Sequence, residues 1–165
     1  MTSSSSVPKT MRALLTAGAP KLPVVEVVPT PEPGPGQILI KVAAVALNPT
    51  DQKHSDEVKE AGLTIGVDCA GTVVGAAPDV TDFQHGERVA AFIHGTRDPG
   101  VGTMAEYVVA FADLVWRVPD NLSFEEASTM NCGSVRSWAI AFALADCAVD
   151  CGRPSNAPTT PRVFS

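Results

Sequence analysis

The histidines and cysteines of this sequence are the residues most able to bind a metal ion, and their spacing does not favour one. The three histidines are His54, His85 and His94, and the four cysteines include no Cys-x-x-Cys pair. A catalytic zinc ion needs about three soft or borderline protein ligands and one open coordination position. We therefore expect no bound metal, and we interpret the cysteines as reduced, mostly buried thiols.

One glycine-rich segment has the spacing of a dinucleotide-binding turn. Residues 100–105 read Gly-Val-Gly-Thr-Met-Ala, which matches the Gly-x-Gly-x-x-Gly/Ala pattern. Such a turn binds a pyrophosphate only when a strand precedes it and a helix follows it. Here Arg97-Asp98-Pro99 precedes the segment and the strand-like Glu106–Val109 follows it. We interpret it as a loop, and no other segment offers the pattern.

Asp51 and Lys53 form a short charged segment with two possible interpretations. Lys53 would suit contact with a phosphate or a ribose as a point charge. The pair could equally be a solvated loop pair, because charged loop residues are common. Asn48 has a side chain able to hydrogen-bond the turn before Pro49.

Composition narrows the classes of partner. The chain has 165 residues, of which 45% are hydrophobic, and a formal net charge of −6. This acidic balance argues against nucleic acid or an anionic membrane surface as the main binding partner, because either would require a basic face on the protein. The longest apolar run, Trp138–Ala145, is far shorter than the roughly 20 residues of a membrane span. Residues 2–6 are polar and lack the apolar stretch of a secretory signal. We expect a cytoplasmic protein with a disordered leader at residues 1–10.

The order of elements predicts a mainly β fold with C-terminal helices. Runs of β-branched or alternating residues predict short strands. These are Met11–Thr16, Val24–Val28, Ile38–Leu47, Cys69–Val74, Arg88–Phe92, Ala105–Val109 and Leu114–Val118. Ser123 and Glu126 form a capping box that predicts a helix over Phe124–Met130. A second, apolar helix is expected over Val135–Ala145. An antiparallel barrel or sandwich followed by helices fits this order.

Five segments together resemble the N-terminal, chaperonin-10-like (GroES-like) catalytic domain of the medium-chain dehydrogenase/reductase family. They occur in the order and spacing of that family over residues 11–145. The segments are Ala46-Leu47-Asn48-Pro49-Thr50-Asp51, Gly66–Val74, Gly86–Val89, Ala105–Val109 and Val118–Ala127. Within the family the chain resembles trans-acting enoyl reductases of fungal polyketide biosynthesis. The variants Asp51-Gln52-Lys53-His54 and Leu114-Val115-Trp116 carry this narrower likeness.

The resemblance points to the zinc-independent branch. Zinc-dependent members have Cys-His-Thr-Asp where this chain has Asn48-Pro49-Thr50-Asp51. They have Gly-His-Glu where it has Gly66-Val67-Asp68, and residues 95–105 contain no cysteine. Asn, Pro and Val cannot supply the missing ligands.

The resemblance also implies a domain division. Residues 11–130 correspond to the GroES-like catalytic domain. Residues 131–165 correspond to a helix and a truncated connection toward a nucleotide-binding domain. Because the chain ends at Val163-Phe164-Ser165, about where the first strand of that domain would begin, we expect the Rossmann domain to be absent.

The resemblance implies one segment that contacts the cofactor and another that lines the substrate pocket. The segment that would contact NADPH is Thr50, Asp51, Gln52 and Lys53. The segment that would line the acyl pocket is Asn131, Cys132, Gly133, Ser134, Val135, Arg136, Ser137 and Trp138. The implied reaction delivers hydride to the β carbon of an α,β-unsaturated thioester and then protonates the α carbon. No catalytic residue is assigned. Arg136 and Trp138 are bulky where relatives have small residues, so the pocket is either reshaped for another ligand or no longer works. Alternatively, Trp138 packs against the barrel and Arg136 reaches solvent.

Three hypotheses follow from these expectations. The chain is a truncated enoyl reductase without activity of its own, whose partners would be an enoyl thioester or polyketide and a polyketide synthase. Alternatively, it is a non-redox polyketide-binding cyclase or isomerase that uses the retained pocket. The third hypothesis is a docking or dimerisation module that uses an exposed apolar helix at Val135–Ala145.

Overall fold

A computed structural model describes residues 7–133 of the chain. By its internal contacts the chain divides into two units, Met1–Cys132 and Gly133–Ser165, and the architecture below is that of the first. The expected second helix at Val135–Ala145, and Ser134 to Trp138 of the expected acyl segment, lie outside the described residues.

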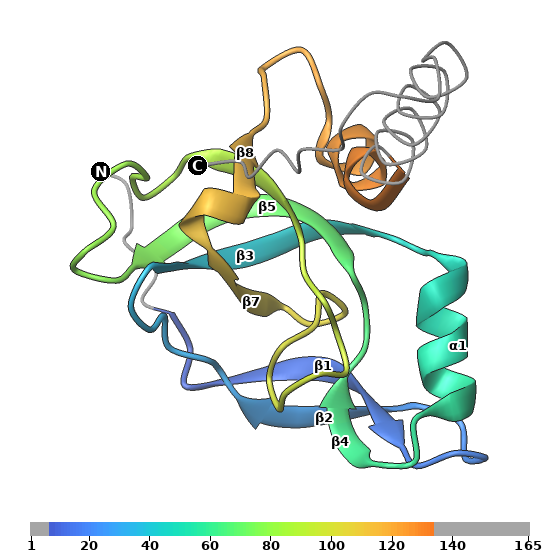
Figure 1. Cartoon of the computed structure of the whole chain (residues 1–165). Helices are drawn as coiled ribbons and strands as arrows, with labels where there is room; N and C mark the ends of the chain where they lie inside the picture. The colour runs from blue at the N-terminus through green and yellow to red at the C-terminus, as the bar shows by residue number, and fades with distance from the viewer. Residues whose placement is uncertain (1–6, 134–165) are drawn as a thin grey trace, which may run out of the picture. The chain divides into compact units, whose positions relative to one another are not determined.

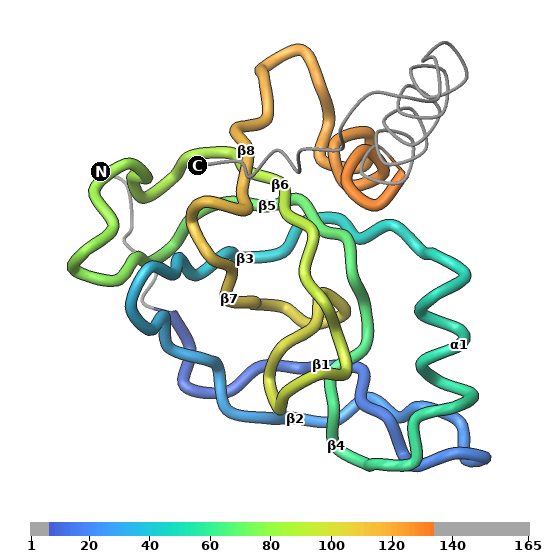
Figure 2. Tube along the Cα trace, viewed as in Figure 1, coloured from blue at the N-terminus to red at the C-terminus, as the bar shows by residue number. Residues whose placement is uncertain are grey.

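Two antiparallel sheets make up the fold (Figures 1 and 2). The smaller has the order β2-β1-β4, with β1 at Thr10–Ala17, β2 at Val24–Pro29 and β4 at Ala61–Thr64. The larger has the order β7-β3-β5-β6-β8. Its strands are β3 (Gln37–Ala46), β5 (Asp68–Ala76), β6 (Arg88–Phe92), β7 (Tyr107–Phe111) and β8 (Val115–Arg117). Every pairing between these described strands is antiparallel, so residues 7–133 contain no parallel Rossmann sheet.

Residues 103–106 join the two sheets into a barrel-like arrangement. Met104 accepts a hydrogen bond from Leu14 N in β1 at 2.8 Å, and Glu106 accepts one from Val42 N in β3 at 3.0 Å. This segment follows Gly100 and leads into β7 rather than into a helix. The interpretation of residues 100–105 as a loop is therefore confirmed.

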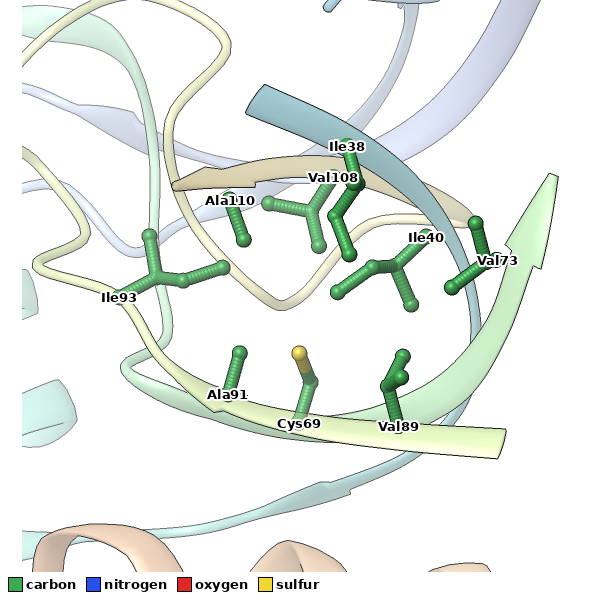
Figure 3. Close-up of a cluster of buried hydrophobic side chains, with 9 residues drawn as sticks. All are labelled: Ile38, Ile40, Cys69, Val73, Val89, Ala91, Ile93, Val108 and Ala110. Atoms are coloured by element: carbon green, nitrogen blue, oxygen red, sulfur yellow. The ribbon is translucent and has the colours of Figure 1, made fainter. Parts of the chain in front are cut away.

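The hydrophobic core on the inner face of the larger sheet follows the two-residue period of its strands. Cys69 of β5 and both Val89 and Ala91 of β6 belong to the inner cluster, whereas Ala70 and Ala90 face the other side. Figure 3 shows the inner cluster, with side chains from β3, β5, β6 and β7 pointing toward one another. The alternation predicted from the sequence is what buries this face.

A helix over residues 124–133 covers the outer face of the larger sheet. It begins with the predicted capping box, since Glu126 N donates to Ser123 Oγ at 3.1 Å and Ser123 N donates to Glu126 Oε2 at 2.8 Å. Ala127 packs against Ala70 and Ala90. Small residues on both sides allow the helix to approach the sheet closely.

Two elements differ from the sequence prediction. The strand β4 was not predicted, because its four residues are too few to show an alternating pattern. The helix α1 (Pro49–Glu57) stands where a solvated loop pair was one interpretation of Asp51 and Lys53. That interpretation is wrong for Asp51, which is buried, although Lys53 is exposed. The sequence of this helix has no apolar stripe from which a helix could be predicted, because Asp51 is its only buried residue.

Among the described residues, no helix combines the length and apolar character needed to cross a bilayer.

Candidate functional site

The helix α1 begins at a polar N-terminus beside the end of β3 (Figure 1). Asn48 is its N-cap residue, and Pro49 supplies the fixed backbone that suits a first helical position. The Asp51 carboxylate accepts a hydrogen bond from the Asn48 backbone N–H at 2.7 Å. This bond satisfies a main-chain donor ahead of the helix and fixes the Asp51 side chain.

A second buried carboxylate, Asp68, lies next to this N-terminus. Its Oδ2 accepts a hydrogen bond from Asn48 Nδ2 at 2.9 Å, and its Oδ1 accepts one from Cys132 N at 3.0 Å. Burial raises the pKa of Asp68, and the nearby charge of Asp51 raises it further. The two hydrogen bonds act in the opposite direction by stabilising the ionised form.

A cavity of about 490 Å³ opens beside α1. Its polar wall is formed by Asn48, Asp51, Gln52 and Ser55, and the rest of its lining is apolar: Leu14, Pro23, Leu47, Pro49, Ile65 and Met104. A mostly apolar pocket with a few polar groups gathered on one side is the usual form of a small-molecule site. A second, shallower cavity of about 340 Å³ shares Leu14 and Met104 with the first.

The residues predicted to contact NADPH divide between this cavity and the solvent. Asp51 and Gln52 line the cavity, whereas Thr50 and Lys53 lie on the same helix outside the lining. Among residues 7–133, none donates a hydrogen bond to Asp51 Oδ1, and this oxygen is itself buried. Gln52 lines the cavity and is exposed, so its amide can hydrogen-bond the hydroxyl or carboxamide groups of a nicotinamide nucleotide. Exposed Lys53 suits a phosphate.

The residues predicted to line the acyl pocket are described only as far as Gly133. Asn131 is buried, and its side chain is engaged within the fold: Oδ1 accepts from Trp116 Nε1 at 2.6 Å. Its Nδ2 lies 3.3 Å from Ser128 O and 3.4 Å from Cys69 O. The backbone N–H of Cys132 donates a hydrogen bond to Asp68 Oδ1. Contact of these residues with a substrate stays a prediction.

Sequence reasoning missed several residues of the site. Asp68 could have been noticed as a carboxylate that opens the otherwise apolar run Cys69-Ala70. Leu14, Ile65 and Met104 carried no signal, because nothing in the sequence separates a cavity wall from a core. The histidines His54 and His94 do come together, with ring centroids 5.6 Å apart. Within residues 7–133, however, no group of three or more His, Cys, Asp or Glu is placed to hold a metal ion.

The fold and the family model agree on the class of this protein. Residues 34–120 match the alcohol dehydrogenase GroES-like domain, and the chain belongs to that family. The human synaptic vesicle membrane protein VAT-1 homolog-like protein superposes with a TM-score of 0.73 at 29% identity, covering 82% of this chain and 44% of that one. A mycobacterial protein complexed with NADPH gives 0.60 at 29% identity, covering 72% and 37%. The predicted membership of the medium-chain dehydrogenase/reductase family is confirmed.

The curated proteins that this chain is similar to include trans-enoyl reductases of fungi. Trans-enoyl reductase resD of Aspergillus sclerotiorum is 42% identical over 126 residues, which cover 74% of this chain and 35% of the relative. Trans-enoyl reductase traG of Penicillium crustosum is 39% identical over 130 residues, covering 77% and 36%. The matched part of the chain thus spans about a third of the length of these relatives.

Proposed function

We propose that this chain is the substrate-side domain of an NADPH-dependent trans-acting enoyl reductase in fungal polyketide biosynthesis, and that alone it does not reduce an enoyl thioester. The observation that carries the proposal is the cavity beside α1, where a polar wall that includes Asp51 and Gln52 faces an apolar lining. The likeness to fungal trans-enoyl reductases supports the choice of reaction. Those relatives are about three times as long as the part that matches, which supports the claim of inactivity alone.

The residues of the cavity fit distinct roles in this reaction. NADPH, when bound, supplies the hydride that adds to the β carbon of the enoyl thioester. Leu14, Ile65 and Met104 provide an apolar surface that holds the acyl chain and excludes water. Asp51 and Gln52, on the polar wall, are placed to contact the cofactor or the substrate. Lys53, on the same helix, pairs with a phosphate by charge.

A non-redox polyketide-binding role, as a cyclase or isomerase, is the second candidate. The adjoining cavities favour it, because together they give an apolar surface that continues past Leu14 and Met104 toward Val25 and Val45. Such a surface would bind a polyketide without any cofactor.

Two titrations of the 165-residue chain test the proposal. A 2-enoyl N-acetylcysteamine thioester is added while the melting temperature is followed, and NADPH is added while its fluorescence is followed. We expect the thioester to stabilise the fold, by about 2.7 kcal/mol at a hundred times its Kd. We expect no turnover of the thioester with NADPH. Reduction by this chain alone would overturn the claim of inactivity, and no response to the thioester would overturn the substrate-side assignment.

A matched pair of variants locates the binding. Met104→Trp fills the floor shared by both cavities and is expected to abolish stabilisation by the thioester. Leu114→Trp adds the same ring at an exposed residue that lines neither cavity, and is expected to leave the stabilisation unchanged. A saturated polyketide that stabilises the chain more than the enoyl thioester does would favour the non-redox role.

A further inference from the structure

Strand register places Asp68 where three elements meet. It is the first residue of β5, paired on one side with Ala46 at the end of β3 and on the other with Phe92 at the end of β6. Two residues after Ala46 the chain reaches Asn48, the N-cap of α1. The start of β5 is therefore held beside the start of α1 by the backbone pairing of the sheet, with Asp68 only 1% exposed.

The two oxygens of Asp68 bind two different segments. Oδ2 accepts from the Asn48 side chain at 2.9 Å, and Oδ1 accepts from the Cys132 main chain at 3.0 Å. The partners are separated from Asp68 by 20 and 64 positions in the sequence. Bonds to an ionised carboxylate are stronger than neutral ones, so one side chain holds two distant segments at a fixed separation.

Burial of the Asp68 carboxylate reduces the free energy of unfolding. No ion pair involving Asp68 is found between the side chains of residues 7–133. Burying a carboxylate without a cation costs free energy even when it is hydrogen-bonded. Because burial raises the pKa of Asp68, folding stability is lost as the pH rises from the ordinary value of 3.8 through the raised pKa. An apolar residue of similar size would avoid the cost of the buried charge, but it would take this acceptor away from Asn48 Nδ2 and Cys132 N.

We propose that Asp68 is a positioning residue that fixes the N-terminus of α1 relative to residues 131–132. The first segment leads into the predicted cofactor contacts, and the second begins the predicted acyl segment. The functional meaning of this link rests on the proposed function above, whereas the link itself does not.

Hydrogen exchange of backbone amides, read separately for residues 49–57 and 124–133, tests the link. Asp68→Leu removes both acceptors. We expect exchange to accelerate about tenfold in both segments, as the loss of hydrogen bonds to a charged group implies. The melting temperature is expected to fall, because Asn48 Nδ2 and Cys132 N lose this acceptor, and removal of the buried charge offsets part of that loss. Acceleration in only one segment, or uniformly along the chain, would overturn the proposal.

Exchanging the two side chains provides the rescue. In Asp68→Asn alone, the amide keeps one oxygen for two donors, so its NH₂ group is set against either Asn48 Nδ2 or Cys132 N. Combining Asn48→Asp with Asp68→Asn restores one donor facing one acceptor and leaves an oxygen for Cys132 N. We expect the double variant to slow exchange in both segments relative to Asp68→Asn. Failure of this rescue would contradict the link.

A control and a ligand readout complete the design. Asp79→Asn alters an exposed carboxylate that accepts from Gly36 N at 2.9 Å, and should leave residues 49–57 and 124–133 unchanged. If the proposed function holds, stabilisation by the thioester should be lost in Asp68→Leu and recovered in the double variant. Coupled exchange without any thioester response in the unaltered chain would uphold the link and overturn the proposed function. Thioester binding by the unaltered chain, without faster exchange of both segments in Asp68→Leu, would uphold the proposed function and overturn the link.

Discussion

The indole nitrogen of Trp116 in β8 donates a hydrogen bond to the side-chain oxygen of Asn131 at 2.6 Å, which fastens the helix over residues 124–133 to the larger sheet. Asn131 is only 6% exposed. A buried indole N–H that loses its acceptor pays the full cost of its desolvation. The contact is therefore expected to matter for stability as well as for the placing of this helix.

Asn131→Ala should lower the free energy of unfolding by about 1–3 kcal/mol, because Trp116 Nε1 is left without its partner. Urea denaturation followed by far-ultraviolet circular dichroism measures the loss. Thr129→Ala, on the exposed side of the same helix, removes only a bond to Glu126 O and should change stability by less than about 0.5 kcal/mol. Equal losses in the two variants would contradict the assigned role of the contact.

Gly71 and Gly75 of β5 give a second test, of the packing between β3 and β5. A Cβ at Gly71 would collide with the main-chain oxygen of Lys41. A Cβ at Gly75 would lie 3.5 Å from Leu39 Cβ, an ordinary contact. We expect Gly71→Ala to cost about 1–3 kcal/mol or more, and Gly75→Ala to change stability by less than about 1 kcal/mol. Thermal unfolding of both variants checks this, and similar melting temperatures would argue against the close approach at Gly71.

His54 should make stability depend on pH. Burial lowers the pKa of His54, neighbouring His94 lowers it further, and the carboxylates of Asp51 and Glu57 oppose the shift. A depressed pKa means that stability is fully present above the ordinary value of 6.5 and is lost as the pH falls through the folded value. We expect the urea midpoint to fall on the acid side of that range.

Two histidine variants separate this effect from other titrations. His54→Gln should weaken the acid-side loss of stability, because the buried group no longer has to become charged. His85→Gln makes the same exchange at an exposed histidine and serves as the matched control. If both variants keep the full acid-side loss, His54 is not its origin.

The thiol of Cys69 should not react with alkylating reagents in the folded protein. Burial, assisted by the neighbouring charge of Asp68, raises the pKa of Cys69 to about 12. Because only the thiolate reacts, iodoacetamide should leave this residue unmodified at mildly alkaline pH and should modify it fully in urea. Peptide mapping by mass spectrometry gives the extent at Cys69 itself. Comparable labelling rates with and without urea would show that the thiol is accessible.

Much of the fold could be predicted because its signals are local. The alternation around Cys69, Ala70 and Val73 marks a strand whatever the rest of the chain does. The Ser123 and Glu126 capping box marks a helix start within four residues. The helix α1 was not predicted because its residues are polar on every side. Its sequence nevertheless carries a helix-start signal, since Asn48 precedes Pro49 and is followed by Asp51 three residues later.

The sequence by itself determined the strands other than β4, the capped helix and the resemblance that the family match confirms. Only the tertiary structure decided what surrounds each polar group. It buried Asp51, engaged Asn131 with Trp116, and placed Asp68 between Asn48 and Cys132. The physical reason is that these contacts join residues far apart in the chain. Their partners are set by the register of β5 against β3 and β6, which no local pattern encodes.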